Sequence, residues 1–197
     1  MKKITLYISL IILILNSSCK TENKTNLKKL AELDAQKTTE LITQILKNET
    51  KGYLSSSCIT EKPRALYYPM VPDFGNYVIE HLKIKDTAHY ESQYKLYKQF
   101  KITSKLVPNK NILTQEEFKE FEKKSENGGF YFWDWLDENC KNGYCSMTKP
   151  IFNESFNLAY IIIGNFCGNL CAGGEERIYE FVNGKWILKK TIGSWVS

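Results

Sequence analysis

The residues with the greatest capacity for chemistry are six cysteines: Cys19, Cys58, Cys140, Cys145, Cys167 and Cys171. Cys140 and Cys145 form one cluster, and Cys167 and Cys171 form a second, each among the glycine and asparagine residues that are typical of turns. In an oxidising compartment we expect the local disulfides Cys140–Cys145 and Cys167–Cys171, with Cys58 left unpaired. A bridge between the two clusters is the alternative.

The same two clusters could supply four thiolates to a zinc ion. Zinc sites usually place two residues between paired cysteines, whereas these pairs enclose four and three residues. We therefore expect no metal. The sequence also lacks a Cys-x-x-Cys motif, which argues against thiol–disulfide catalysis.

Few other residues suggest catalysis. A nucleophile needs a base, and the two histidines, His81 and His89, are not placed beside any particular serine or cysteine by the sequence. Asp134 and Asp137 could act as an acid–base pair, but such pairs are also common on surfaces. We expect both histidines to have packing or surface roles.

A second carboxylate pair, Glu175 and Glu176, directly follows two glycines. Gly173 and Gly174 lack the Lys-Ser/Thr of a phosphate-binding loop and the pattern of a dinucleotide-binding turn. We therefore expect no cofactor. The glycines are expected to allow a turn with positive φ.

The first nineteen residues have the order of a bacterial export signal. Residues 2–3 are lysines, residues 4–15 are apolar and uncharged, and Ser17-Ser18 precedes Cys19. As a helix, the apolar stretch would span about 18 Å, whereas the hydrocarbon core of a bilayer is about 30 Å thick. The segment can direct export but would make a poor permanent transmembrane helix. A plain secretory signal or an uncleaved anchor is the alternative.

The Ser17-Ser18-Cys19 junction resembles the lipobox of bacterial lipoproteins, in the looser form found in Bacteroidota, with Asn16 where Leu or Val is common. The resemblance implies that the Cys19 thiol receives a diacylglycerol, that a peptidase removes residues 1–18 as a signal peptide, and that the new amino group is acylated. Each buried CH₂ of these chains would contribute about 0.8 kcal/mol of membrane affinity. The predicted partner is therefore a membrane, with the outer membrane favoured, and residues 19–26 form a polar, lipid-anchored tether.

The charge of the chain does not suggest a nucleic-acid partner. Lys and Arg together number 27 and Asp and Glu 22, for a net charge of +5, and only Arg64 and Arg177 are arginines. Arginine is the side chain that forks onto phosphates and guanine edges. Lysines interspersed with acidic residues indicate a solvated surface, so no nucleic-acid binding is expected.

The first part of the mature chain favours helices. Apolar spacing predicts an amphipathic helix over residues 26–47. Asp86 is expected to N-cap a second helix, whose tyrosines Tyr90, Tyr94 and Tyr97 share one side. Thr114 and Glu117 form a capping box for a third helix over residues 115–124. The aromatic run 130–136 is interpreted as a buried strand or an edge that covers the core.

The C-terminal part favours strands. Residues 159–166 are rich in β-branched side chains, and residues 176–182 and 185–190 flank Asn183-Gly184, the strongest short hairpin signal. A last strand over 192–196 is expected to close the sheet. The fold class predicted is α+β, with N-terminal helices packed on a C-terminal antiparallel β-meander, in one domain over residues 27–197.

The C-terminal segment carries a second resemblance. Cys167-Gly168-Asn169-Leu170-Cys171 and the terminal Trp195-Val196-Ser197 resemble the closing segment of uncharacterised Bacteroidota lipoproteins, with Ala172 where a glycine is common. That family has no settled biochemistry, so the resemblance implies no particular activity. We expect a lipid-anchored cell-envelope protein with a binding or structural accessory role. An envelope hydrolase, using His89 or the Asp134/Asp137 region, and an immunity or inhibitor protein against a secreted toxin are the alternatives.

Overall fold

The computed structural model describes residues 28–49, 52–63, 73–129, 131–168 and 170–197. Residues 28–48 are helical, and the chain divides within this helix into one compact unit that ends at Lys37 and a second that begins at Thr38. In the first unit, the described residues 28–37 are helical throughout. All contacts reported below lie within the second unit. The predicted signal peptide and tether lie outside the described residues.

The second unit is built on a mixed seven-stranded sheet with the strand order β2-β1-β3-β5-β6-β7, in which β4 also pairs with β5. The strands are β1 (Cys58–Thr60), β2 (Asn111–Leu113), β3 (Tyr144–Met147), β4 (Ile151–Phe152), β5 (Leu158–Gly168), β6 (Cys171–Val182) and β7 (Lys185–Val196). β3, β5, β6 and β7 are antiparallel neighbours, whereas β1 runs parallel to both β2 and β3. The predicted antiparallel meander is confirmed for the C-terminal strands, but the complete sheet is mixed.

The β6–β7 hairpin forms at the predicted turn. Asn183 and Gly184 have φ values of 50° and 79°, because a tight two-residue hairpin requires positive φ at both positions. The returning residues form one continuous strand, β7, rather than the two predicted strands. The pairing of β6 with this edge strand shifts register twice, between Glu176 and Arg177 and between Ile178 and Tyr179, as it does at β-bulges.

The remaining helices are η1 (Gly52–Leu54), α2 (Phe74–Leu82), α3 (Thr87–Gln99), α4 (Gln115–Glu126) and α5 (Phe132–Asn139). Asp86 caps α3 as predicted, since its side chain accepts the N–H of Ala88 at 2.9 Å. The strand predicted over residues 130–136 is wrong, because α5 occupies most of that run. Phe132 and Leu136 are four residues apart and therefore share the helix face that packs inward.

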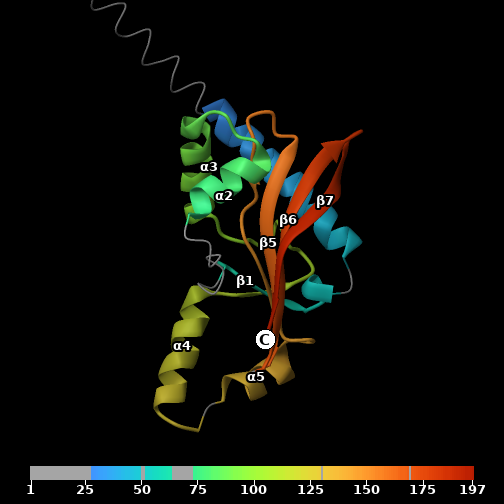
Figure 1. Ribbon diagram of the computed structural model, residues 1–197. Coiled ribbons are helices and arrows are strands. Elements are labelled where there is room, and N and C mark those ends of the chain that lie inside the picture. Colours follow the sequence, from blue (N-terminus) through green and yellow to red (C-terminus); the bar gives the residue numbers. More distant parts are fainter. Residues whose placement is uncertain (1–27, 50–51, 64–72, 130, 169) are drawn as a thin grey trace, which may run out of the picture. The chain divides into compact units, whose positions relative to one another are not determined.

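One face of the sheet carries the main apolar cluster. Side chains of β5 and β6 that alternate along the strands, including Tyr160, Ile162 and Ile178, pack there with residues from α2 to α5. Figure 1 shows α2 and α3 beside the ends of the long strands nearest the β6–β7 hairpin, and α4 and α5 toward the opposite ends, where the C-terminus lies. Side chains of the intervening strand positions point to the opposite face.

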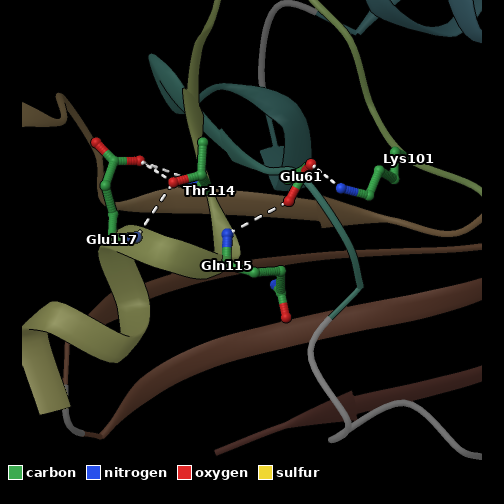
Figure 2. Close-up of polar contacts among 5 residues, drawn as sticks. All are labelled: Glu61, Lys101, Thr114, Gln115 and Glu117. Atoms are coloured by element: carbon green, nitrogen blue, oxygen red, sulfur yellow. Dashed lines mark hydrogen bonds and ion pairs between the residues drawn. The ribbon is translucent and has the colours of Figure 1, made fainter.

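A set of charge-assisted contacts positions the N-terminus of α4 (Figure 2). Thr114 accepts the N–H of Glu117 at 3.2 Å, and the Glu117 carboxylate accepts the N–H of Thr114 at 2.7 Å, which completes the predicted capping box. Glu61, directly after β1, accepts the N–H of Gln115 at 3.3 Å and pairs with Lys101 at 2.6 Å. The hydrogen bond from Lys101 lowers the pKa of the Glu61 carboxyl.

We predict that Glu61→Gln lowers the free energy of unfolding by about 1 kcal/mol at pH 7, because it removes an ion pair and a carboxylate from a helix N-terminus. A carboxyl with a lowered native pKa contributes stability above its unfolded-state pKa and loses it as the pH falls through the native pKa. Urea unfolding at pH 7 and at pH 3 should therefore show a deficit that disappears in acid. Glu120→Gln, an exposed change on the same helix, is the control. A deficit that is equal at both pH values would contradict this role.

Candidate functional site

Two disulfides link the described cysteines. Cys58–Cys140 joins β1 to the C-terminus of α5, and Cys167–Cys171 closes the turn between β5 and β6. The second is the local bridge predicted from the sequence. Because disulfides form and persist in oxidising compartments, the two bonds indicate an extracytoplasmic location.

The predicted Cys140–Cys145 bridge is wrong, because Cys140 and Cys145 point to opposite faces of the sheet. Cys58 and Tyr144 are register partners on β1 and β3, and both pack with Cys140 in the main apolar cluster. Successive strand residues alternate in direction, so Cys145 points to the other face. Cys58, which the sequence analysis left unpaired, bonds to Cys140 instead.

Cys145 is a free, buried thiol that donates to the carbonyl of Cys58 at 3.3 Å. Burial raises its pKa to about 11, which disfavours the reactive thiolate at neutral pH. The zinc arrangement weighed from the sequence would need the thiols of Cys140, Cys167 and Cys171, which are oxidised. Within the described residues, no group of three or more metal-ligating side chains is arranged to hold an ion.

His89 and Gln93 of α3 both contact the backbone of β4. Its Nε2 lies 3.0 Å from the carbonyl oxygen of Phe152, and Gln93, one turn further along α3, accepts the N–H of the same residue at 3.1 Å. Two side chains therefore take the backbone positions that a neighbouring strand would take. The imidazole is buried and has Phe156 against its edge, so it serves packing, as the sequence analysis expected.

The other proposed catalytic residues do not converge on one site. Asp134 and Asp137 are both exposed on α5. The ring of His81 packs against Tyr77 with their centroids 4.4 Å apart. Neither arrangement brings a nucleophile, a base and an oxyanion donor together.

Successive side chains of β6 point to opposite faces of the sheet, so Glu175 and Glu176 lie on different faces and have different partners. Glu175 accepts from Nε of Arg177 at 2.6 Å, and Arg177 also pairs with Glu49, which directly follows the 28–48 helix. Tyr179 donates to the same Glu49 carboxylate at 3.1 Å. These contacts attach the helix end to this face of the sheet, so Glu175 has a structural role.

Glu176 lies on the opposite face, in an aromatic setting that we call the Tyr160–Glu176 cluster: Tyr77, Tyr160, Glu176 and Gly193. Tyr160 donates its hydroxyl to Oε2 of Glu176 at 2.8 Å, and Tyr77 bonds to the same carboxylate from α2. Gly193 is the register partner of Glu176 on β7. A Cβ at position 193 would lie only 3.0 Å from Oε1, so the carboxylate rests against the bare strand.

The phenols of this cluster are held in the neutral form. Burial raises the pKa of Tyr77 to about 12, and the Glu176 charge adds to the effect. The pKa of Tyr160 is raised for the same two reasons, burial being the larger. Neutral phenols donate hydrogen bonds but do not act as bases, so the two tyrosines serve to orient the Glu176 carboxylate.

The sequence analysis named Glu176 but not its partners. Tyr160 and Glu176 are a diagonal pair across β5 and β6, since Ile162 is the direct register partner of Glu176. Once residues 159–166 and 176–182 are assigned to neighbouring strands, Tyr160 and Glu176 can be recognised as possible hydrogen-bond partners on the same face. The register itself cannot be derived from this pairing, and Tyr77 comes from a distant helix.

We predict that the two disulfides contribute unequally to stability. The Cys58–Cys140 bond joins residues 82 apart, whereas the Cys167–Cys171 bond joins residues 4 apart. From loop-closure entropy, removing the long bridge should cost about 4–5 kcal/mol and removing the short one about 2 kcal/mol. Denaturant unfolding of the C58A/C140A and C167A/C171A double variants tests this. An equal loss in the two variants would contradict the unequal contribution.

We predict that Cys145 resists alkylation in the native protein and is labelled after unfolding, because burial both shields the thiol and disfavours its thiolate. Iodoacetamide labelling without reductant, followed by peptide mapping, should modify Cys145 only in urea. Peptides containing Cys58 and Cys140 should remain joined under both conditions. Rapid labelling of Cys145 in the absence of urea would contradict the burial of this thiol.

In the Tyr160–Glu176 cluster, ionisable groups from separate elements meet on the helix-covered face of the sheet. The cluster combines a half-buried carboxylate with two neutral phenols. Comparison of the chain with protein families, curated proteins and solved structures found no match. A function must therefore be inferred from the chain's own residues.

Proposed function

We propose that this protein is exported and anchored by lipid at Cys19 to the bacterial cell envelope, on the outer membrane, where its folded domain has a binding or accessory role. The observation that carries the proposal is the junction Ser17-Ser18-Cys19 after a short apolar segment. Residues 1–27 lie outside the described part of the chain, so lipidation stays a prediction. The resemblance to Bacteroidota lipoproteins supports the outer membrane as the destination.

The described domain supports export through its disulfides, which require an oxidising compartment to form and persist. Among the described residues, no helix has the length and hydropathy needed to cross a bilayer. Attachment by acyl chains provides a membrane contact that does not depend on such a helix.

A binding role fits the described chemistry better than a hydrolase does. His89 is committed to the backbone of β4, and the two aspartates of α5 are exposed. The Tyr160–Glu176 cluster offers hydrogen bonds and a negative charge. Such groups recognise a ligand without breaking bonds in it.

We predict that Cys19→Ala abolishes incorporation of an alkyne-labelled palmitate during growth and shifts the protein from the membrane fraction to the soluble fraction. Without the Cys19 thiol, no atom can accept the diacylglycerol. In-gel fluorescence of the immunoprecipitated chain measures the label. Cys145→Ala, which removes a different unpaired cysteine, should leave labelling unchanged.

Continued labelling of the Cys19→Ala protein would refute the anchor. Separating inner from outer membranes on a density gradient tests the destination independently. Recovery of the labelled protein in the inner membrane would contradict the outer-membrane assignment while leaving lipidation intact.

A further inference from the structure

Glu176 differs from the other half-buried carboxylates that contact the sheet, because no cation opposes it. Glu175 and Glu49 both pair with Arg177. Around Glu176, by contrast, the contacts recorded in the described chain come from tyrosine hydroxyls, and no lysine or arginine is among them. The two hydroxyl donors satisfy the oxygens of this half-buried carboxylate but supply no opposite charge.

The neighbours of this carboxylate cannot neutralise it. Tyr77 and Tyr160 are neutral donors whose pKa values are raised. They orient the carboxylate but leave its negative charge uncompensated. Aromatic rings in general attract a cation that lies over their faces.

The aromatic environment extends beyond these two phenols. Phe74 contacts Tyr160 edge-on at a centroid distance of 5.9 Å and lies 6.1 Å from Tyr97. Trp195 packs beside Gly174, two residues before Glu176 on β6. Aromatic rings from α2, α3, β5 and β7 thus lie in the neighbourhood of the cluster.

Gly193 leaves room for the Glu176 carboxylate beside β7. Because it has no side chain, Oε1 of Glu176 can lie directly against β7, and both residues remain half-buried rather than sealed. A methyl group at position 193 would meet the carboxylate at 3.0 Å and force it to shift. The glycine therefore keeps the carboxylate in the position where it is held by Tyr160.

From this geometry we infer that the Tyr160–Glu176 cluster binds an organic ammonium ion, with Glu176 as the charge partner and the surrounding rings against its alkyl groups. A carboxylate beside aromatic faces is the arrangement that recognises alkylated ammonium groups. A hard metal ion such as Ca²⁺ needs six to eight oxygen ligands. The described residues contain no cluster of metal-ligating groups of that kind.

This inference names a ligand class for the binding role proposed above, but its test does not depend on the lipid. The full chain, purified in dodecyl maltoside from whichever cell fraction contains it, is titrated with choline and followed by saturation-transfer NMR. We expect saturable binding in the wild type. We expect at least a tenfold weaker affinity in Glu176→Gln, which keeps the acceptor for Tyr160 but removes the charge.

Glu180→Gln is the matched control, because it removes the same charge from the same face of β6, where Glu180 forms only a surface pair with Lys189 at 2.9 Å. Its affinity for choline should equal that of the wild type. The neutral analogue 3,3-dimethyl-1-butanol, which has the shape of choline without the charge, should not compete. If Glu176→Gln fails to fold, Gly193→Ala provides the second variant and should also weaken binding at least tenfold.

Three results would overturn the inference: no saturable choline binding by the wild type, equal affinity in the wild type and the folded Glu176 or Gly193 variant, or equal competition by the neutral analogue. A protein that binds choline as described but carries no lipid would leave this inference intact while refuting the anchor. A lipidated protein that does not bind choline would do the reverse.

Discussion

The two-residue alternation of the central strands is the constraint on which the chemistry of this domain depends. Along β6 it directs Glu175 to one face and Glu176 to the other, so two adjacent carboxylates enter different environments. One joins Arg177 and Glu49 and attaches a helix end to the sheet. The other meets tyrosine hydroxyls in an aromatic setting. A single-residue shift in register would exchange these roles.

The same alternation determines the cysteine pairing. Tyr144 and Cys145 are neighbours in β3, yet Tyr144 packs with the Cys58–Cys140 disulfide while the Cys145 thiol is buried on the other face. Sequence proximity favoured Cys145 as the partner of Cys140, but strand direction excludes it. The one bond that proximity predicts correctly, Cys167–Cys171, lies in a turn, where the cysteines are brought together without help from distant elements.

The elements that could be predicted are those whose signal is local. The capping box at Thr114, the N-cap at Asp86 and the Asn183-Gly184 turn each depend on residues within a few positions, and all three are confirmed. The aromatic run before Leu136 forms a helix although aromatic residues favour strands, because packing of Phe132 and Leu136 on the core overrides local propensity. β1 is three residues long and lies in the sheet only because β2 and β3 flank it, so no local pattern marks it. The Tyr160–Glu176 cluster requires the register of two strands and the docking of α2, which a sequence pattern does not contain.

The long disulfide has a consequence for the order in which the domain is completed. A chain that is made from its N-terminus presents Cys58 well before Cys140, which follows 82 residues later. β1 also cannot pair in the sheet until β2 and β3 have been made, because both of these parallel partners follow it in the sequence. Cys140 and Cys145 then emerge almost together, and early oxidation can trap either of them. The native bond therefore depends on Cys140, and not the neighbouring Cys145, reaching Cys58.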